Sequence, residues 1–491
     1  MFQNAIPLLL LLSIVWSCLF LQVDSFTASS RISSGETMNA AYDTEARALL
    51  DKVYLLIPTN VLETKHEILA KVRQEHAADV QASNATLLAR EDELLQSAGV
   101  APTTDLTYQY QYQYQYQWVT TSTTANNRSA AVLQTIGEPL LTSDERQQIR
   151  TAADHLWKNQ NTTASRFTYQ RPGNYEAHLA ELQTDLKIGV QPATPSLIAN
   201  TLLSKIYPMV RRAFQLEDYS GTAAPLCVYD ALVIRYNATQ AVSGQGAGQP
   251  LHRDLGLVSV NLQLNSHLEF QGGGTWFENH PTDYDKIKQP LKPVSAGHAL
   301  AHFSSERHAG AATTKGVRDI LVLFLLSTQP TPMELCARLK GQPSALSRCL
   351  AIEQVPTDGE AWHYLGMAIQ QENPETALQC LRYATQFTPR DARLYNNLGL
   401  VLNRLGGCPI QSYERSIELH TLSQSGGCQV DADLDSVLLN YGLYLSNKDE
   451  FAPACNVLER VSQGDSSRIQ RDAAGLLRFC RRKHLDNQRR Q

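Results

Sequence analysis

Two histidines and an aspartate in the middle of the chain have the residue types of a metal site. His252 and Asp254 lie two positions apart in "LHRDLG", just before "VSVNLQLN", which alternates apolar and polar residues like a strand. Positions i and i+2 of an extended segment point to the same side, so one ion can bind both side chains. His308, in "SERHAG", supplies a third ligand if a neighbouring strand brings it close. Two imidazoles and one carboxylate on one side of an octahedral ion suit Fe(II) and leave three positions open.

An arginine downstream is suited to bind a carboxylate. Arg318 follows His308 by ten residues and begins the apolar segment "RDILVLFLL". A buried arginine is costly unless it is paired, and its planar guanidinium can bind a carboxylate with two hydrogen bonds. We therefore expect Arg318 to bind a chelating cosubstrate. Lys315 is the alternative anchor, although single charges near turns are usually solvated. A second His-x-Asp, His484-Leu-Asp486, lies in a charged tail with no later histidine, which indicates a chance occurrence.

Residues 225 to 328 resemble the Fe(II)/2-oxoglutarate dioxygenases of the prolyl 4-hydroxylase and procollagen lysyl hydroxylase type. The segments "HRDLGLVSVNLQLN", "FQGGGTWFE" and "RHAGAATTKGVRDILVLF" carry this resemblance, in the order that such enzymes have. It implies that His252, Asp254 and His308 bind Fe(II) and that Arg318 binds the distal carboxylate of 2-oxoglutarate. Tyr236, in "VIRYNA", would contribute to the 2-oxoglutarate site. No catalytic residue is expected beyond the metal site.

The same resemblance implies an activity. The enzyme would hydroxylate peptidyl proline or lysine, release succinate and CO2, and use L-ascorbate to keep the iron reduced. Ala309 stands where lysyl-type enzymes often have an acidic residue, and Arg318 stands where many prolyl-type enzymes have lysine. These departures leave the acceptor residue open. The alternative function is a repeat-based interaction protein with a catalytically inactive dioxygenase-like domain.

The elements that must position these residues are short strands. After residue 225 the chain alternates short apolar segments with Gly-rich turns, which favours a sandwich or jelly roll. The resemblance implies a double-stranded β-helix with flanking helices. In "VSVNLQLN" the apolar and polar residues alternate, which predicts a half-buried strand with one polar face. No Lys-Ser/Thr follows Gly272–Gly274, so we expect a tight turn or a close backbone approach rather than a phosphate site. His298 and His302 are expected to be structural.

The C-terminal third contains a repeat. Leu365-Gly366 aligns with Leu398-Gly399 at a spacing of 33 residues, and a looser third copy contains Gly442. The period and the glycines are typical of tetratricopeptide-like helical pairs, with ordinary helical hairpins as the alternative. Such repeats would bind an extended peptide or a further protein partner.

The N-terminus predicts entry into the secretory pathway. Residues 1 to 23 carry no charged side chain, which is typical of a cleaved signal peptide or an uncleaved signal anchor. We expect a location in the endoplasmic reticulum lumen, with membrane attachment only if the segment is uncleaved. The Ser-rich "SFTASSRISS" leaves a plastid address as an alternative. Four Asn-x-Ser/Thr sites suit a glycoprotein, and Cys336 and Cys349 are the expected disulfide.

Composition and local patterns divide the chain of 491 residues into several domains. A net charge of −5 gives no electrostatic indication of nucleic-acid binding. "YQYQYQYQYQW" predicts either an aromatic-faced strand or, as we favour, a low-complexity linker. The expected domains are a signal segment (1–24), a helical region (25–104), a Tyr/Gln- and Thr-rich linker (105–130), the dioxygenase domain (131–330), a linker (331–349) and the helical repeats (350–485).

Overall fold

The chain forms two compact units, Met1–Asp51 and Lys52–Gln491. Of the first unit, the structure describes residues 35–51, which belong to helix α2 (Gly35–Tyr54). The expected signal segment therefore lies outside the described residues. Among the described helices, none is long and apolar enough to cross a bilayer. The computed structural model describes residues 35–84, 115–118, 132–159, 173–178, 201–214, 216, 225–241, 246–278, 289–425, 433–461 and 467–490.

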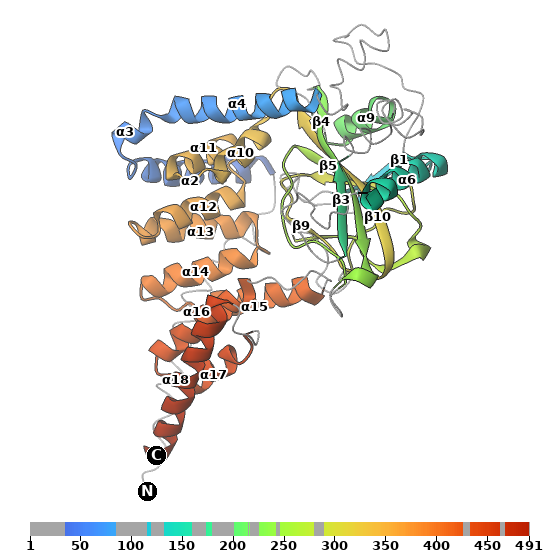
Figure 1. The fold of residues 1–491 in the computed structure, drawn as a ribbon. Coiled ribbons are helices and arrows are strands. Elements are labelled where there is room, and N and C mark those ends of the chain that lie inside the picture. Colours follow the sequence, from blue (N-terminus) through green and yellow to red (C-terminus); the bar gives the residue numbers. More distant parts are fainter. Residues whose placement is uncertain are drawn as a thin grey trace. The chain divides into compact units, whose positions relative to one another are not determined.

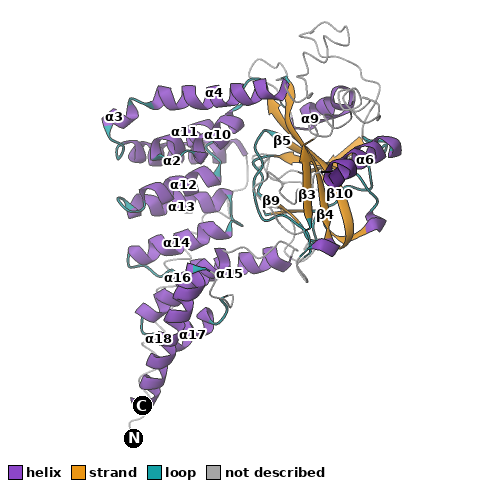
Figure 2. Ribbon diagram, viewed as in Figure 1, coloured by secondary structure: helices purple, strands orange, loops and turns teal. Residues whose placement is uncertain are grey.

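An antiparallel sheet occupies the middle of the chain (Figures 1 and 2). A second, two-stranded sheet pairs β7 (Thr275–Phe277) with β9 (His308–Gly310). The main sheet consists, in spatial order, of β1 (Gln115–Trp118), β2 (Val132–Ile136), β8 (Ala299–Phe303), β5 (Val258–Gln263), β10 (Thr313–Ser327), β4 (Leu226–Asn237) and β3 (Asn174–His178), with β6 (Phe270–Gly272) paired to the start of β10.

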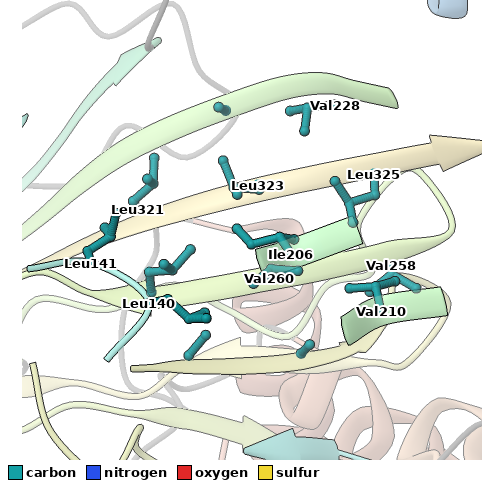
Figure 3. Packing of buried hydrophobic residues seen from close by; sticks show 14 of the residues in the cluster. Leu140, Leu141, Ile206, Val210, Val228, Val258, Val260, Leu321, Leu323 and Leu325 are labelled. Carbon is teal, nitrogen blue, oxygen red and sulfur yellow. The ribbon is translucent and has the colours of Figure 1, made fainter. Parts of the chain in front are cut away.

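The two faces of the main sheet have different partners. Leu321, Leu323 and Leu325 of β10 pack in the large apolar core, which Figure 3 shows with residues of β4 and β5. Helices α6 (Ser143–Asn159) and α9 (Tyr207–Phe214) contribute buried side chains to this core. Because side chains alternate along a strand, the intervening residues of β10 lie on the opposite face. We call that opposite face the inner face; Ile320, Val322, Leu232, Ile234 and Tyr236 form an apolar cluster on it.

Strand β5 is buried on both faces, so the prediction of a half-buried strand was wrong. Its polar residues Ser259, Asn261 and Gln263 lie on the inner face and are buried there, next to β8, against which the second sheet packs. Phe277 of β7 packs edge-on against His302 of β8, with ring centres 5.0 Å apart. Alternation correctly indicates which residues share a face, but it does not say whether water or another sheet covers that face.

The region expected to be a linker at 331–349 is helical instead. It contains α10 (Pro332–Gly341) and the start of α11 (Ala345–Gln354). Thr331 and Glu334 form a reciprocal cap at the start of α10. Cys336 and Cys349 are buried free thiols in these helices, so the expected disulfide is absent. The Cys349 thiol is fully buried, and the Cys336 thiol donates to Oδ2 of Asp358 at 3.5 Å.

Three helix pairs follow. In each, a glycine of the first helix touches the second helix: a Cβ at Gly366, Gly399 or Gly442 would lie 3.0, 2.6 or 2.6 Å from a side chain of that helix. The glycines used to align the repeats therefore permit the same close helix packing in each pair. The pairs are α12 (Gly359–Ile369) with α13 (Pro374–Phe387), α14 (Ala392–Arg404) with α15 (Ile410–Ser425), and α16 (Asp433–Asn447) with α17 (Phe451–Leu458), followed by α18 (Arg468–Arg490).

Two N-terminal segments are more closely integrated than expected. Helices α3 (Thr59–Leu62) and α4 (Lys65–Asn84) lie in the predicted helical region. The His76 ring of α4 hydrogen-bonds to the Ser327 carbonyl at the end of β10, at 2.8 Å. The end of the Tyr/Gln stretch forms strand β1 instead of a linker. Its Trp118 packs against Phe214 of α9, with ring centres 5.5 Å apart, because alternation directs that side chain to the core.

Candidate metal centre

The structure brings His252, Asp254 and His308 together. One ligand atom of each lies within 4.8 Å of the others. The Asp254 oxygens lie 3.4 Å from Nε2 of His252 and 3.5 Å from Nε2 of His308. The backbone N–H of each histidine donates to the carbonyl of the other, at 2.8 and 2.9 Å. This short antiparallel bridge places two distant parts of the chain around one point.

Hydrogen bonds orient both imidazoles. Nδ1 of His252 donates to the Pro250 carbonyl at 2.8 Å, and Nδ1 of His308 donates to the Glu306 carbonyl at 2.9 Å. A carbonyl only accepts, so each Nδ1 carries a proton, and each Nε2 faces Asp254 and is the atom that a metal would bind. Metal-binding histidines usually have this arrangement. The donor set of two Nε2 atoms and a carboxylate fits Fe(II).

The local environment holds two of the three groups in metal-binding form. Burial lowers the pKa of His308 to about 3, so its imidazole is neutral. Burial opposes ionisation of Asp254, but the neighbouring imidazoles outweigh it and hold its pKa well below the usual range. Burial also lowers the pKa of His252, yet its hydrogen bond and charge interaction with Asp254 raise it overall. A proton on His252 is therefore the one that a metal must displace.

Ser259 orients the carboxylate, and the sequence interpretation missed it. Its hydroxyl donates to Oδ2 of Asp254 at 2.6 Å and lies 2.9 Å from the Ser304 hydroxyl. The Asp254 N–H donates to the Ser304 carbonyl at 3.1 Å. Ser259 belongs to the polar face of β5, five residues after Asp254. Its position shortly after the His-x-Asp pair was the sequence feature that could have identified Ser259.

Arg318 lies on the inner face and is 1% exposed. Its Nε donates to Oε1 of Gln263, and its Nη1 donates to the Gly274 carbonyl, both at 3.3 Å. Among the described residues, no carboxylate forms an ion pair with it, and burial lowers its pKa. An uncompensated buried cation is costly and calls for an anionic ligand. The alternative anchor, Lys315, is exposed.

Tyr236 lies beside Arg318 and close to the strand that carries His308. It lies opposite Arg318 on β4, and the guanidinium carbon is 5.5 Å from its ring centre. A Cβ at Gly310 would lie 3.0 Å from the Tyr236 hydroxyl, so this hydroxyl is close to the strand that carries His308. Burial raises the Tyr236 pKa, which keeps the phenol neutral.

The expected glycine turn is a close backbone approach to Arg318. Gly272, Gly273 and Gly274 have φ values of 73°, 66° and 116°, which L side chains rarely adopt. A Cβ at Gly273 would lie 2.9 Å from Cδ of Arg318. These glycines therefore let the turn reach the arginine and supply the Gly274 carbonyl.

The remaining histidines of interest lie outside the cluster. His298 and His302 are buried, and the His302 ring centre lies 4.5 Å from that of His308. Neither belongs to the metal-ligand group found among the described residues. His484 and Asp486 lie on helix α18, where positions two apart do not face each other.

No protein-family model matches the chain, and no curated protein matches it. Solved structures similar to parts of the chain include three proteins. A Pseudomonas putida prolyl-4-hydroxylase is 12% identical over 44% of this chain and 94% of that chain, with a TM-score of 0.26. AviO1 from Streptomyces viridochromogenes Tue57 is 15% identical over 41% and 91%, with a TM-score of 0.27. The epimerase SnoN, in a complex with Fe3+, alpha ketoglutarate and nogalamycin RO, is 14% identical over 41% and 81%, with a TM-score of 0.27. Because these similarities are low and cover only part of the chain, the geometry of the metal-ligand cluster and of Arg318 must indicate the function.

Proposed function

We propose that the chain is an Fe(II)- and 2-oxoglutarate-dependent dioxygenase. The observation that carries this proposal is Arg318, a buried cation without a carboxylate partner among the described residues. It lies beside Tyr236, whose hydroxyl is near the strand of His308. A ligand with one carboxylate for Arg318 and a chelating group for a metal fits this arrangement. 2-Oxoglutarate has both.

The residues of the site would divide the work. His252, Asp254 and His308 would hold the iron on one side and leave adjacent positions for ligands. Arg318 would bind the distal carboxylate of 2-oxoglutarate, and Tyr236 would position it. Bound iron and 2-oxoglutarate would supply the oxidising chemistry for C–H hydroxylation, with succinate and CO2 as co-products. Burial of Arg318 would strengthen its attraction for the carboxylate, because water does not screen the pair.

We further propose a peptidyl prolyl or lysyl substrate, with L-ascorbate as reductant. The resemblance of the three sequence segments around His252, Gly274 and Arg318 to prolyl and lysyl hydroxylases supports this assignment. In the proposed domain organisation, a double-stranded β-helix would be the catalytic domain. Tetratricopeptide-like repeats would hold the peptide or a partner, as the aligned glycines of the helix pairs suggest. The apolar N-terminal run supports a secretory-pathway location.

The test is turnover by the purified full chain with Fe(II), 2-oxoglutarate, ascorbate and Pro- or Lys-rich peptides. We expect succinate release and the gain of one oxygen atom by a peptide, measured by mass spectrometry. His308→Ala should abolish both. His298→Ala, which alters a buried histidine outside the cluster, should retain both. Equally negligible turnover by wild type and His308→Ala would favour the inactive interaction protein instead.

A further inference from the structure

Each of the two metal-ligand segments has an arginine next to a ligand. Arg253 lies between His252 and Asp254, and Arg307 directly precedes His308. Adjacent residues of extended backbone point to opposite sides, so these arginines point away from the metal-ligand cluster. Their side chains are only 18% and 6% exposed. Buried guanidinium groups require anionic partners.

Helix α12 provides the partner of Arg253. Oε2 of Glu360, in the first turn of α12, lies 2.6 Å from Nε of Arg253. The other end of the same guanidinium donates from Nη1 to the Ser305 carbonyl, in the turn before β9. Glu360 is itself only 5% exposed, so little water screens this ion pair. Arg253 thus ties the His252–Asp254 segment to a helix far along the chain.

Helix α14 provides a second link, through Arg307. This arginine hydrogen-bonds to Glu278 at the end of β7, and its Nη1 lies 3.6 Å from Oδ1 of Asp391. Asp391 caps the N-terminus of α14. Arg393 then joins both links, with Nη2 2.7 Å from Asp391 and 3.1 Å from Glu360.

These contacts form one continuous group, which we call the charge cluster. Lys340 of α10 also belongs to it, with Nζ 3.1 Å from Glu360 and 2.8 Å from Asp358. Positive and negative members are equal in number, as expected for charges removed from water. The members are Arg253, Arg307, Lys340, Arg393, Glu278, Asp358, Glu360 and Asp391.

We infer that Glu360 is a positioning residue for the metal centre, acting through Arg253. Without the carboxylate, the buried guanidinium loses its anion and must move toward water or another acceptor. The backbone of Arg253 is continuous with both His252 and Asp254, so that movement displaces two ligands at once. Metal–ligand distances in a real site lie within about 0.2 Å of their usual values, so displaced ligands bind the metal less well. The inference rests on the proposed function, because it takes the His-Asp-His group to be a metal site.

The experiment measures metal affinity of the full-length apo protein, with Co(II) as the probe and its visible absorption as the signal. The variant is Glu360→Gln, which keeps the shape of the side chain and removes its charge. The matched control is Glu353→Gln on α11. Its carboxylate also forms an ion pair, with Lys65 at 2.9 Å, but lies outside the charge cluster. Thermal unfolding of each apo protein is recorded in parallel.

We expect Glu360→Gln to weaken Co(II) binding about tenfold or more and to change the absorption spectrum, as loss of an outer-shell contact does. Glu353→Gln should bind Co(II) as the wild type does. A purely structural role would lower the unfolding temperature of Glu360→Gln and leave the affinity and spectrum of the folded protein unchanged. That result would overturn the inference.

Two further comparisons keep the outcome decisive. If Glu360→Gln does not fold, Glu360→Asp retains the charge but withdraws it by one methylene. A weaker Co(II) affinity of that variant supports the inference, and wild-type affinity overturns it.

His308→Ala distinguishes the two proposals. Wild type that binds Co(II) no better than His308→Ala would contradict the proposed function itself. Binding lost in His308→Ala but unchanged in Glu360→Gln would contradict only the positioning role.

Discussion

Arg318 and Tyr236 lie directly opposite each other on β10 and β4, with the guanidinium carbon 5.5 Å from the centre of the phenol ring. Tyr236 is 1% exposed, as is Arg318. The ring offers a favourable surface to the cation but no negative charge. The pair therefore leaves the positive charge of Arg318 available to an anionic ligand.

Removal of this charge should impair the use of 2-oxoglutarate. We expect Arg318→Met to raise the KM for 2-oxoglutarate about 10- to 100-fold. This factor corresponds to the free energy that a hydrogen bond to a charged group contributes. Co(II) affinity should stay near that of the wild type, since Arg318 is not a ligand. Lys315→Met is the control and should change neither quantity, because Lys315 is exposed. A raised KM in Lys315→Met alone would identify Lys315 as the carboxylate anchor.

The glycine turn should be intolerant of a side chain. Gly273→Ala places a Cβ 2.9 Å from Arg318 at a φ of 66°, so we expect a loss of more than about 1 kcal/mol in unfolding free energy. Displacement of Arg318 should also raise the KM for 2-oxoglutarate. Gly406→Ala is the matched control. Its φ is 75°, but nothing lies within 4 Å of the added Cβ, so stability should fall while the KM stays unchanged. Equal KM values for both variants and wild type would contradict the role given to the turn.

Metal affinity should depend on pH through His252. Asp254 raises the pKa of this imidazole, so the folded apo protein holds a proton there at a higher pH than an ordinary histidine does. Metal binding must displace that proton. We therefore expect Co(II) affinity to fall about tenfold per pH unit below the pKa of His252 and to level off above it. His308, with a pKa near 3, contributes no further protons in this range. Titrations at mildly acidic and neutral pH measure this slope. A flat profile would contradict the competition between the metal and a proton on His252.

The hydroxyl of Ser259 should support Asp254. Ser259→Ala removes a 2.6 Å hydrogen bond to the carboxylate, and we expect Co(II) affinity to fall about tenfold. Ser347→Ala serves as the control because Ser347 is equally buried but bonds within α11 and its cap. Titration of both variants under the same conditions gives the comparison. Equal affinities would show that Asp254 is held in place without Ser259.

The sequence alone determined the residue types and the local spacing of apolar, polar and glycine residues. It pointed to His252, Asp254, His308 and Arg318 as candidate site residues, and the family resemblance added Tyr236. The structure groups His252, Asp254 and His308 and places Tyr236 beside Arg318. The sequence also identified the spacing of Gly366 and Gly399, because two helices that pack closely need a small residue at each contact. These features depend on neighbouring residues, which are visible in a single sequence.

Only the tertiary structure decided what covers each face and which charges pair. The polar residues of β5 were predicted to form the polar face of a half-buried strand, but they are buried in the folded chain. The segment taken for a linker at 331–349 is instead helical. The ion pair of Arg253 with Glu360 joins residues far apart in the chain, and no local pattern encodes such a pairing. The physical reason is that alternation and capping act within a few residues, whereas burial and ion pairing depend on the path of the whole chain.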